Sequence, residues 1–468
     1  MRFVFSRLRR PLFLAVVACC SVSIGCVTPG KPWKSSPPRI SSSAIPPPLP
    51  ELTRVSASVD TTTEIPSELS PDQLVRLVLL RNPLVEQMQA AASAAQAKYA
   101  QVTSLDDPMF GFTTAPGSIG SPNANYAARV EISQKILASG KLELRGQRAN
   151  SEAAAALHDV DDARLKLAET TRIAYADYYL ASQRAEIGEE SIKLLKEFRQ
   201  NAETRYKNGL SSQQDMLQAE VEIARQEERL VSIRRARNVS QARINTLLHR
   251  PANESLPAFR GVNPSITLPN PAELRQRAIA LRPDVKALNA RIAADKAALG
   301  SAQREYAPDV ELTAAYDSFW QGAASRPFQW QIGARVNLPI RYSRRDGAVN
   351  EAKANLIQRR ATLNRLSDQI AFEVQESYEQ LKESLDIIEL YRNKILPAAE
   401  GNIKAAQSAY ITGKVPFLSL AEARRSLIES KDRYVETLAE SIRRRAILER
   451  AVGDSLFLDQ STAPSKPS

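Results

Sequence analysis

The sequence predicts a mainly α-helical protein with a small β part: a long, coiled-coil-like helical barrel, to which four strands per chain add a portion of a β-barrel. The helical prediction depends on residues 141–207, which contain no proline and only two glycines, Gly146 and Gly188. A globular domain needs no helix of that length, whereas coiled coils and repeats use them. The β prediction depends on short segments in which apolar and polar residues alternate.

Composition excludes several classes of function. The net charge is +11 over 468 residues, but the basic residues alternate with acidic ones, as in Gln226–Arg229. This pattern is typical of a solvated helix face rather than a nucleic-acid-binding surface. All three cysteines lie within the first 26 residues and only two histidines occur, so the body lacks the residues for a disulfide or a Cys–His site. With no phosphate-binding glycine loop and no nucleophile–base pair, we expect neither an enzyme nor a cofactor.

Residues 1–25 have the features of a secretory signal peptide. Several arginines precede an apolar run, and the run ends in Ser-Ile-Gly followed by Cys26. This ending resembles a lipobox, in which a small residue precedes a cysteine that becomes lipidated, although Ser23 replaces the usual Leu or Val. We expect a lipoprotein anchored through Cys26, with palmitate among its acyl chains; an ordinary signal peptide with an incidental cysteine is the alternative.

The residues that follow Cys26 indicate where the anchor lies. Val27 stands where the signal for inner-membrane retention has Asp, which favours the outer membrane. Residues 26–69 are rich in Pro, Ser and Thr, and such a segment cannot bury enough apolar surface to become ordered. We therefore expect residues 26–69 to form a lipidated tether between the membrane and a folded body.

Short motifs recur in the same order in two halves of the body. Leu80–Pro83 resembles Leu281–Pro283, and Arg205–Leu210 resembles Ala409–Lys414. Recurrence of this kind indicates a duplication. The sequence therefore predicts a first structural repeat, an inter-repeat linker, a second structural repeat and a disordered tail, over residues 70–250, 251–270, 271–455 and 456–468.

Each repeat is expected to contain a helix, two strands, a very long helix, a turn and another long helix. The first helices should span about 70–103 and about 271–304, and Ser70 is a suitable N-cap for the first of them. Apolar residues recur at helical spacing in the long helices, which should therefore pack as coiled coils. Gly209 and Gly413 suit the left-handed conformation that ends a helix.

The predicted strands have the sharpest periodicity in the chain. Every even position is apolar in 328–338, 310–316 and 126–132, and Phe110 and Phe112 belong to a fourth strand. Segments of ~10 residues with one apolar and one polar face suit an outer-membrane barrel; a soluble sheet packed on a core is the alternative. Four strands cannot close a barrel, and a barrel in lipid has no open edges. The strands therefore imply an oligomer.

With this plan and the turn motif around Gly209, residues 70–455 resemble the outer membrane factor (TolC) family. The resemblance implies a homotrimer, in which the strands form a twelve-stranded barrel in the outer membrane and the helices form a tunnel across the periplasm. It also implies a periplasmic adaptor (membrane fusion protein) and an inner-membrane pump as partners, besides outer-membrane lipid. Nucleic acid is not an expected partner.

The resemblance also assigns roles to individual residues. Gly209, Leu210 and Gly413 are expected to contact the adaptor at the far tip of the tunnel, although Lys414 stands where the family prefers a small apolar residue. Glu422 matches an acidic position beyond the second turn, where three copies would form a cation-attracting pore constriction. A surface glutamate in a helix is the equal alternative. No residue is expected to be catalytic or to bind a metal.

Cargo is indicated only by Asp107-Pro108-Met109, which resembles the same stretch in outer-membrane subunits of heavy-metal exporters. We expect the channel subunit of a tripartite efflux system, a passive duct for heavy-metal cations or small toxic compounds. The competing interpretation is a periplasmic coiled-coil adaptor or a structural lipoprotein without a pore. An adaptor would carry one helical hairpin, whereas this sequence predicts two pairs of long helices.

Overall fold

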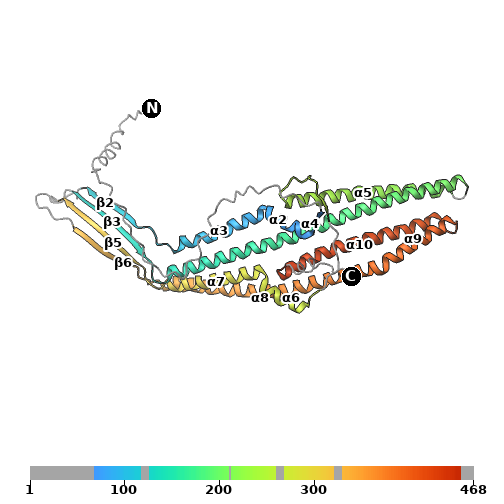
Figure 1. Cartoon of the computed structure of the whole chain (residues 1–468). Helices are drawn as coiled ribbons and strands as arrows, with labels where there is room; N and C mark the ends of the chain where they lie inside the picture. The colour runs from blue at the N-terminus through green and yellow to red at the C-terminus, as the bar shows by residue number, and fades with distance from the viewer. Residues whose placement is uncertain (1–67, 117–125, 210–211, 260–267, 321–328, 455–468) are drawn as a thin grey trace, which may run out of the picture. The chain divides into compact units, whose positions relative to one another are not determined.

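A computed structural model describes residues 68–116, 126–209, 212–259, 268–320 and 329–454 (Figure 1). By its internal contacts the chain divides at residue 64, and every described residue belongs to the unit that follows, Ile65–Ser468. The signal peptide, Cys26 and nearly all of the expected tether therefore lie outside the described residues.

The two halves of this unit follow the same plan, except that the long helix of the second half is interrupted. The first half consists of β1 (Glu68–Leu69), α2 (Pro71–Arg81), α3 (Pro83–Thr103), β2 (Met109–Pro116), β3 (Tyr126–Ile136), α4 (Lys141–Lys207) and α5 (Gln213–Leu247). The second consists of β4 (Ala258–Phe259), α6 (Pro271–Leu281), α7 (Pro283–Arg304), β5 (Val310–Trp320), β6 (Gln329–Val336), α8 (Tyr342–Leu390), the π-helical turn Tyr391–Ile395, α9 (Leu396–Ile411) and α10 (Phe417–Val452).

Each of the two predicted first helices is broken in the structure. The break falls before Pro83 in the first half and before Pro283 in the second. Proline has no N–H to donate and disfavours a helical conformation in the residue before it, and the preceding residues Asn82 and Arg282 are indeed extended, with ψ of 123° and 125°. Asn82 also caps the new helix, because its side chain accepts from the Leu84 N–H at 3.0 Å. The predictions of a single helix over 70–103 and a single helix over 271–304 were therefore wrong.

The long helix of the second half is also interrupted, unlike its counterpart α4. Residues Tyr391–Ile395 form a π-helical turn, in which the Leu396 N–H donates to the Tyr391 carbonyl. Pro397 follows directly in α9. A proline inside a helix clashes with the carbonyl four residues earlier, and a π-turn widens the helix at that point. The second half therefore has two helices where the sequence indicated one.

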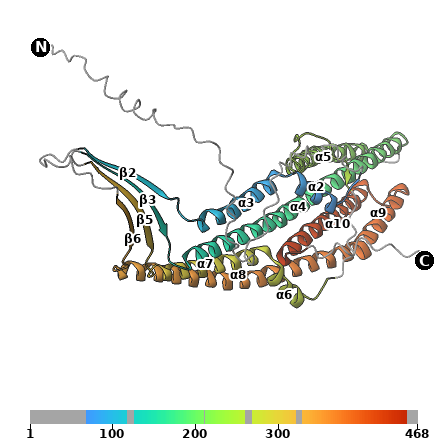
Figure 2. The same cartoon turned by 60° about the vertical axis from the view of Figure 1, so that its left-hand side comes forward.

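The helices lie side by side in one order, with α4 in the middle (Figure 2). α3 and α5 pack along one side of α4, α7 and α10 pack along the other, and α8 packs against α7 and α10. Where α2, α4, α5 and α10 meet, Tyr175 is fully buried and stacks on Phe259 with ring centroids 4.5 Å apart. The parallel pair β1–β4 brings Phe259 to this core and was not foreseen.

A buried ion pair lies in the same region, between α4 and α10. Arg172 Nη1 is 2.6 Å from Glu449 Oε2, and the Glu449 side chain is only 3% exposed. Burial is the largest influence on Glu449 and raises its pKa, against the lowering effect of Arg172 and Arg445. An acid whose pKa is raised in the folded state contributes stability below its unfolded pKa, and this contribution is lost as the pH rises through the folded value.

Replacement of Glu449 by glutamine should therefore change how stability depends on pH. The wild-type chain should lose stability relative to Glu449→Gln as the pH rises from about 4 to about 8, because only wild type must ionise a buried carboxyl group. Apparent melting temperatures of both proteins over this range measure the difference. A difference that grows in favour of wild type with pH would mean that the arginines outweigh burial.

Candidate channel wall and helical tip

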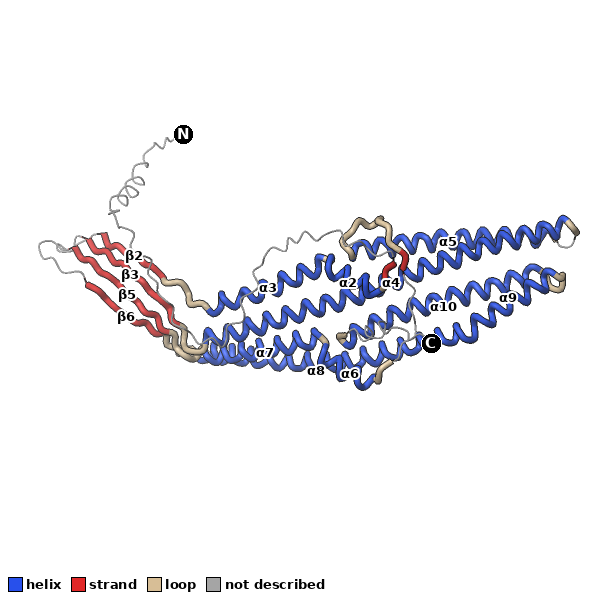
Figure 3. The backbone as a smooth tube through the Cα atoms, viewed as in Figure 1, coloured by secondary structure: helices blue, strands red, loops and turns tan. Residues whose placement is uncertain are grey.

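The four longer strands form one antiparallel sheet in the order β2-β3-β5-β6 (Figure 3). Their register aligns apolar residues across all four strands: the row through Phe112 continues with Val130, Tyr316 and Trp330. A parallel row contains Phe110, Ile132, Ala314 and Ile332. Because residues opposite one another share a face, the predicted alternation yields one continuous apolar face.

This apolar face is exposed in the isolated chain. Ile332 is 91% exposed, Trp330 76% and Phe110 71%, and no described helix covers the sheet in Figures 2 and 3. A water-soluble protein rarely leaves so large a contiguous apolar surface open. The predicted alternative, a sheet packed on a core, therefore does not apply to the described strands.

The opposite face of the sheet carries charged side chains. Glu131 forms ion pairs with Arg129 at 3.1 Å and with Arg335 of β6 at 2.9 Å. Both arginines remain well exposed. The sheet therefore has one side suited to lipid and one suited to water, as a pore-forming strand requires. β6 ends at Val336, two residues before the end of the alternating stretch 328–338. Beyond it, the Asn337 N–H donates to the Asp309 carbonyl at 3.2 Å, and the Asn337 side chain accepts from the Asp309 N–H at 3.1 Å.

At the other end of the helices lie the two turns that the sequence singled out. Gly209 and Gly413 have φ of 69° and 74°, the left-handed conformation expected of them, and a Cβ atom at Gly209 would meet nothing within 4 Å. The two turns lie close together, because Arg205 Nη1 donates to the Ile411 carbonyl at 2.7 Å and its guanidinium lies 5.0 Å from the centre of the Tyr410 ring. Leu210 lies outside the described residues.

Sequence reasoning did not foresee the contact between Arg205 and Tyr410. The available signal was the recurrence of tyrosine before both turn glycines, in Arg205-Tyr206 and at Tyr410. Below this contact, Phe198 of α4 and Ala219 of α5 pack with Phe417 and Leu420 of α10 in a small core. The helices of both repeats are therefore held together at the turns.

Glu422, the proposed constriction residue, is exposed and lines a groove of about 530 Å³ between α5 and α10. The exposed apolar residues Leu217, Val221 and Leu418 also line this groove. Across it, Glu222 of α5 pairs with Arg425 of α10 at 2.9 Å. Glu422 is thus accessible to solutes, as a constriction residue must be.

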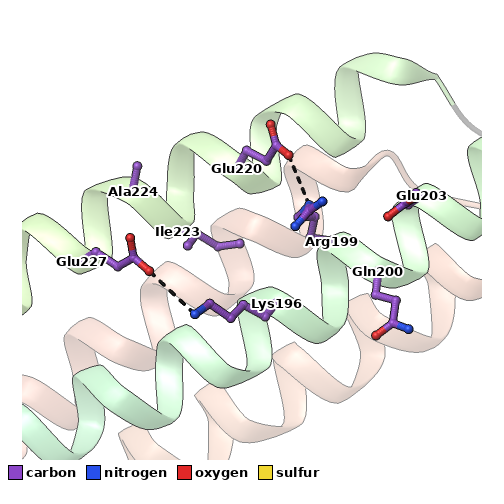
Figure 4. Close-up of a pocket in the computed structure, with 8 residues that line it drawn as sticks. All are labelled: Lys196, Arg199, Gln200, Glu203, Glu220, Ile223, Ala224 and Glu227. Atoms are coloured by element: carbon purple, nitrogen blue, oxygen red, sulfur yellow. Dashed lines mark ion pairs between the residues drawn. The ribbon is translucent and has the colours of Figure 1, made fainter.

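A second cleft, of about 500 Å³, lies between α4 and α5 (Figure 4). Two ion pairs cross it, Lys196–Glu227 at 3.7 Å and Arg199–Glu220 at 3.2 Å. Exposed pairs of this kind contribute about 0–1 kcal/mol each. The cleft therefore has the character of a solvated helix–helix seam and not of a catalytic site.

The described residues contain neither a candidate metal site nor a candidate membrane-spanning helix. Within the described ranges, no three or more His, Cys, Asp or Glu side chains are placed to hold a metal ion. None of the described helices combines the length and the apolar character needed to cross a membrane.

Long packed helices joined to an amphipathic four-stranded sheet define the class of outer-membrane channels, in which a helical barrel continues a β-barrel built from contributed strands. The chain belongs to the outer membrane efflux protein family, whose model matches residues 74–249 and 274–454. The two matched segments fall in the two halves described above.

Individual relatives agree with this assignment. Nodulation protein T of Rhizobium leguminosarum bv. trifolii is 23% identical over 77% of this chain and 80% of its own length. The cobalt-zinc-cadmium resistance protein CzcC of Cupriavidus metallidurans is 24% identical over 58% of this chain and 64% of its own. Among solved structures, the outer-membrane channel OprN matches with a TM-score of 0.71 at 20% identity, over 82% of this chain and 89% of that one. CusC matches with the same TM-score at 18% identity, over 82% and 92%.

Proposed function

We propose that this chain is one subunit of a homotrimeric export channel. Three copies join their four-stranded sheets into a twelve-stranded barrel in the outer membrane, and their helices continue it as a tunnel into the periplasm. The channel is passive: solutes pass through it and no reaction is catalysed. A lipid on Cys26 anchors each subunit, and a periplasmic adaptor and an inner-membrane pump complete the system.

The observation that carries this proposal is the uncovered sheet. Its apolar face is open, and its outer strands β2 and β6 each have one edge without a partner among the described strands. Unpaired backbone groups cost several kcal/mol each in lipid, so that a single copy cannot insert. Pairing of β6 with β2 of another copy satisfies both edges at once, and closure follows when the copies form a ring.

The alternative of a pore-less adaptor or structural lipoprotein is disfavoured by the same features. The chain has a pair of long helices and a β-hairpin in each half, and it belongs to a family of efflux channels. Cell fractionation tests the proposal. The protein should remain in outer membranes after a carbonate wash and run as a heat-sensitive trimer on a gel; a washed-off monomer would refute it.

For the cargo, we propose heavy-metal cations or other small toxic compounds. The support is the Asp107-Pro108-Met109 stretch and the name of one relative, a cobalt-zinc-cadmium resistance protein. A deletion strain should become sensitive to cobalt, zinc or cadmium, and the cloned gene should restore resistance. Sensitivity to organic toxins alone would assign the channel to the second class of cargo.

A constriction at Glu422 gives a direct electrical prediction. Replacement of Glu422 by glutamine should reduce the preference of the channel for cations, because three symmetric carboxylates would lose their charge. Single-channel conductance and reversal potentials in planar bilayers measure the effect. Glu400→Gln, which removes an exposed carboxylate from α9 and none from the Glu422 face of α10, is the control. Equal ion selectivity in wild type and Glu422→Gln would show that Glu422 is a surface glutamate and not part of a constriction.

Adaptor contact at the tip is the remaining proposal for the site. Gly209, Leu210 and Gly413 would lie where the adaptor docks, and the exposed turns at Gly209 and Gly413 support such a role.

A further inference from the structure

We propose that electrostatic complementarity selects how the copies meet: a basic face of α5 on one copy docks against an acidic face of α8 on the next. This inference rests on the proposed trimer and adds to it the charged residues that select and register the contact between copies. It derives from four features of the chain: the position of the two helices, the charges on their free faces, the heights of these charges and the direction of each helix.

α5 and α8 are the outer members of the row of helices. α5 packs on α4, whereas α8 packs on α6, α7 and α10 (Figure 1). Each of these two helices therefore has one side turned away from the rest of the described chain. A channel wall made of several copies must bring one outer helix of each copy against the opposite outer helix of its neighbour.

The free side of α5 is basic around an apolar centre. Arg235, Val239 and Arg243 are spaced four residues apart, which places them on one face of the helix. Val239 is 59% exposed and the Arg243 side chain 51%. Arg235 is exposed and forms no ion pair within the described part of the chain. Residues 229–243 contain five arginines and no acid; three of the five, Arg229, Arg234 and Arg243, pair with acids of α4 or α10 in the same chain.

The free side of α8 is predominantly acidic, with the exposed Lys382 as the one base between Glu379 and Leu390, and likewise contains apolar surface. Glu379, Glu383 and Asp386 follow one another at three- and four-residue spacing, and Leu390 continues the same face. Leu390 is 46% exposed and the Glu383 side chain 60%. Asp386 is exposed and takes part in no ion pair with the described residues. Arg243 and Glu383 also pair within the chain, with Asp177 and Arg444, whereas Arg235 and Asp386 keep their charges for a partner. Charges of one sign on each face match a surface of opposite charge on a neighbour.

Contacts inside the chain place these two faces at the same height. Asp177 of α4 binds Arg443 at 2.6 Å and Arg243 at 3.5 Å. The neighbouring Arg444 binds Glu383 at 2.6 Å. Arg243 on one outer helix and Glu383 on the other are therefore level with each other along the bundle.

The two helices also run in opposite directions. α5 leads away from the turn at Gly209 and α8 leads toward the turn at Gly413, and the two turns lie together. From the level of Arg243 and Glu383, both faces therefore continue toward the turns, α5 through Val239 to Arg235 and α8 through Asp386 to Leu390. Val239 and Leu390 then meet within about one helical turn of each other.

The separation of charge also fixes the direction of assembly. A two-fold dimer would pair α5 with α5 or α8 with α8 and bring like charges together. A head-to-tail contact pairs α5 with α8 at every interface, and such contacts form a ring when the rotation closes. The charges therefore favour a closed ring over a two-fold dimer.

Charge reversal with rescue tests the electrostatic part. Arg235→Glu with Arg243→Glu should reduce the trimer fraction several-fold at low salt, and Glu383→Arg with Asp386→Arg should do the same. The chain that carries all four changes should form trimers again, because the attraction is restored with its sign exchanged. Arg433→Glu, an exposed change on α10, is the control. Raising the ionic strength to about 1 M, where charges are screened within about 3 Å, should lessen both defects.

Disulfide formation tests the register. The wild-type chain has no cysteine after Cys26, so that Val239→Cys combined with Leu390→Cys should yield a covalent trimer on a non-reducing gel. Val221→Cys with Leu390→Cys should not, because Val221 is exposed on the same face of α5 but lies five helical turns, or about 27 Å, from Val239 along the helix.

The outcomes separate the two proposals. If the wild type forms trimers but the cysteine variant does not cross-link and the four-fold charge variant does not recover, the α5–α8 contact is overturned and the channel proposal stands. A wild-type protein that never forms trimers overturns both. Cross-linking with rescue supports both.

Discussion

Replacement of Lys141 by methionine is expected to lower the free energy of unfolding by about 3–5 kcal/mol, because it leaves a buried carboxylate without its cation. Lys141 begins α4, which four residues separate from the end of β3, and its side chain is 2% exposed. Its Nζ lies 2.9 Å from Asp309 Oδ1, and the Asp309 side chain is 9% exposed. The same carboxylate accepts from the Ala138 N–H at 2.9 Å.

This pair joins the sheet to the helices in both repeats at once. Asp309 lies just before β5 of the second half, whereas Lys141 and Ala138 belong to the first. Loss of the pair should therefore loosen the whole junction. Chemical unfolding in detergent, followed by circular dichroism, measures the change. Lys98→Met is the matched control: it removes an exposed pair with Glu152 at 3.4 Å and should cost less than about 1 kcal/mol. Equal losses in the two variants would show that the buried pair has no special role.

Replacement of Gly453 by alanine is expected to destabilise the fold by about 3 kcal/mol, from two costs of similar size. Gly453 ends α10 with φ of 81°, a conformation that costs other residues about 1–2 kcal/mol. A Cβ atom there would also lie 2.9 Å from Arg282 Cα and 3.0 Å from Arg282 N. Overpacking of this kind costs about 1–3 kcal/mol.

Arg282 cannot easily move away from the added methyl group. Its guanidinium binds Asp284 at 2.7 Å and Glu373 at 2.6 Å, and the residue is 8% exposed. Gly209→Ala isolates the conformational cost, because Gly209 has φ of 69° and open space around its Cβ position. We expect Gly209→Ala to cost about 1 kcal/mol, measured by the same unfolding experiment. If both alanine variants unfold alike, contact with Arg282 adds nothing.

The sequence predicted those parts of the fold that depend on local periodicity. The helix over 141–207 was predicted at the bounds that the structure has, because a proline-free helical pattern has no competing local conformation over that length. The strands were predicted because a period of two identifies both a strand and its apolar face. The left-handed glycines at the turns follow from the same kind of local rule.

Other features depend on contacts that no local pattern contains. The π-turn before Pro397 is one of several ways in which a helix accommodates a proline, and a kink is another. Lys141 and Asp309 are 168 residues apart in the sequence. The residues next to each of them in the sequence do not distinguish it from an ordinary surface charge. The breaks at Pro83 and Pro283 could have been predicted from the sequence, because a proline disfavours a helical conformation in the residue before it. The motifs that contain these prolines were interpreted only as signs of a duplication.

Several copies of this chain must close their uncovered sheets into one wall if it forms a channel. Electron cryomicroscopy of the purified protein in lipid nanodiscs tests it most directly. The account predicts a particle with three-fold symmetry, in which β6 of each copy pairs with β2 of the next and twelve strands surround a pore. A particle that contains one chain, with its four-stranded sheet covered by its own helices or lying free in solution, would contradict it.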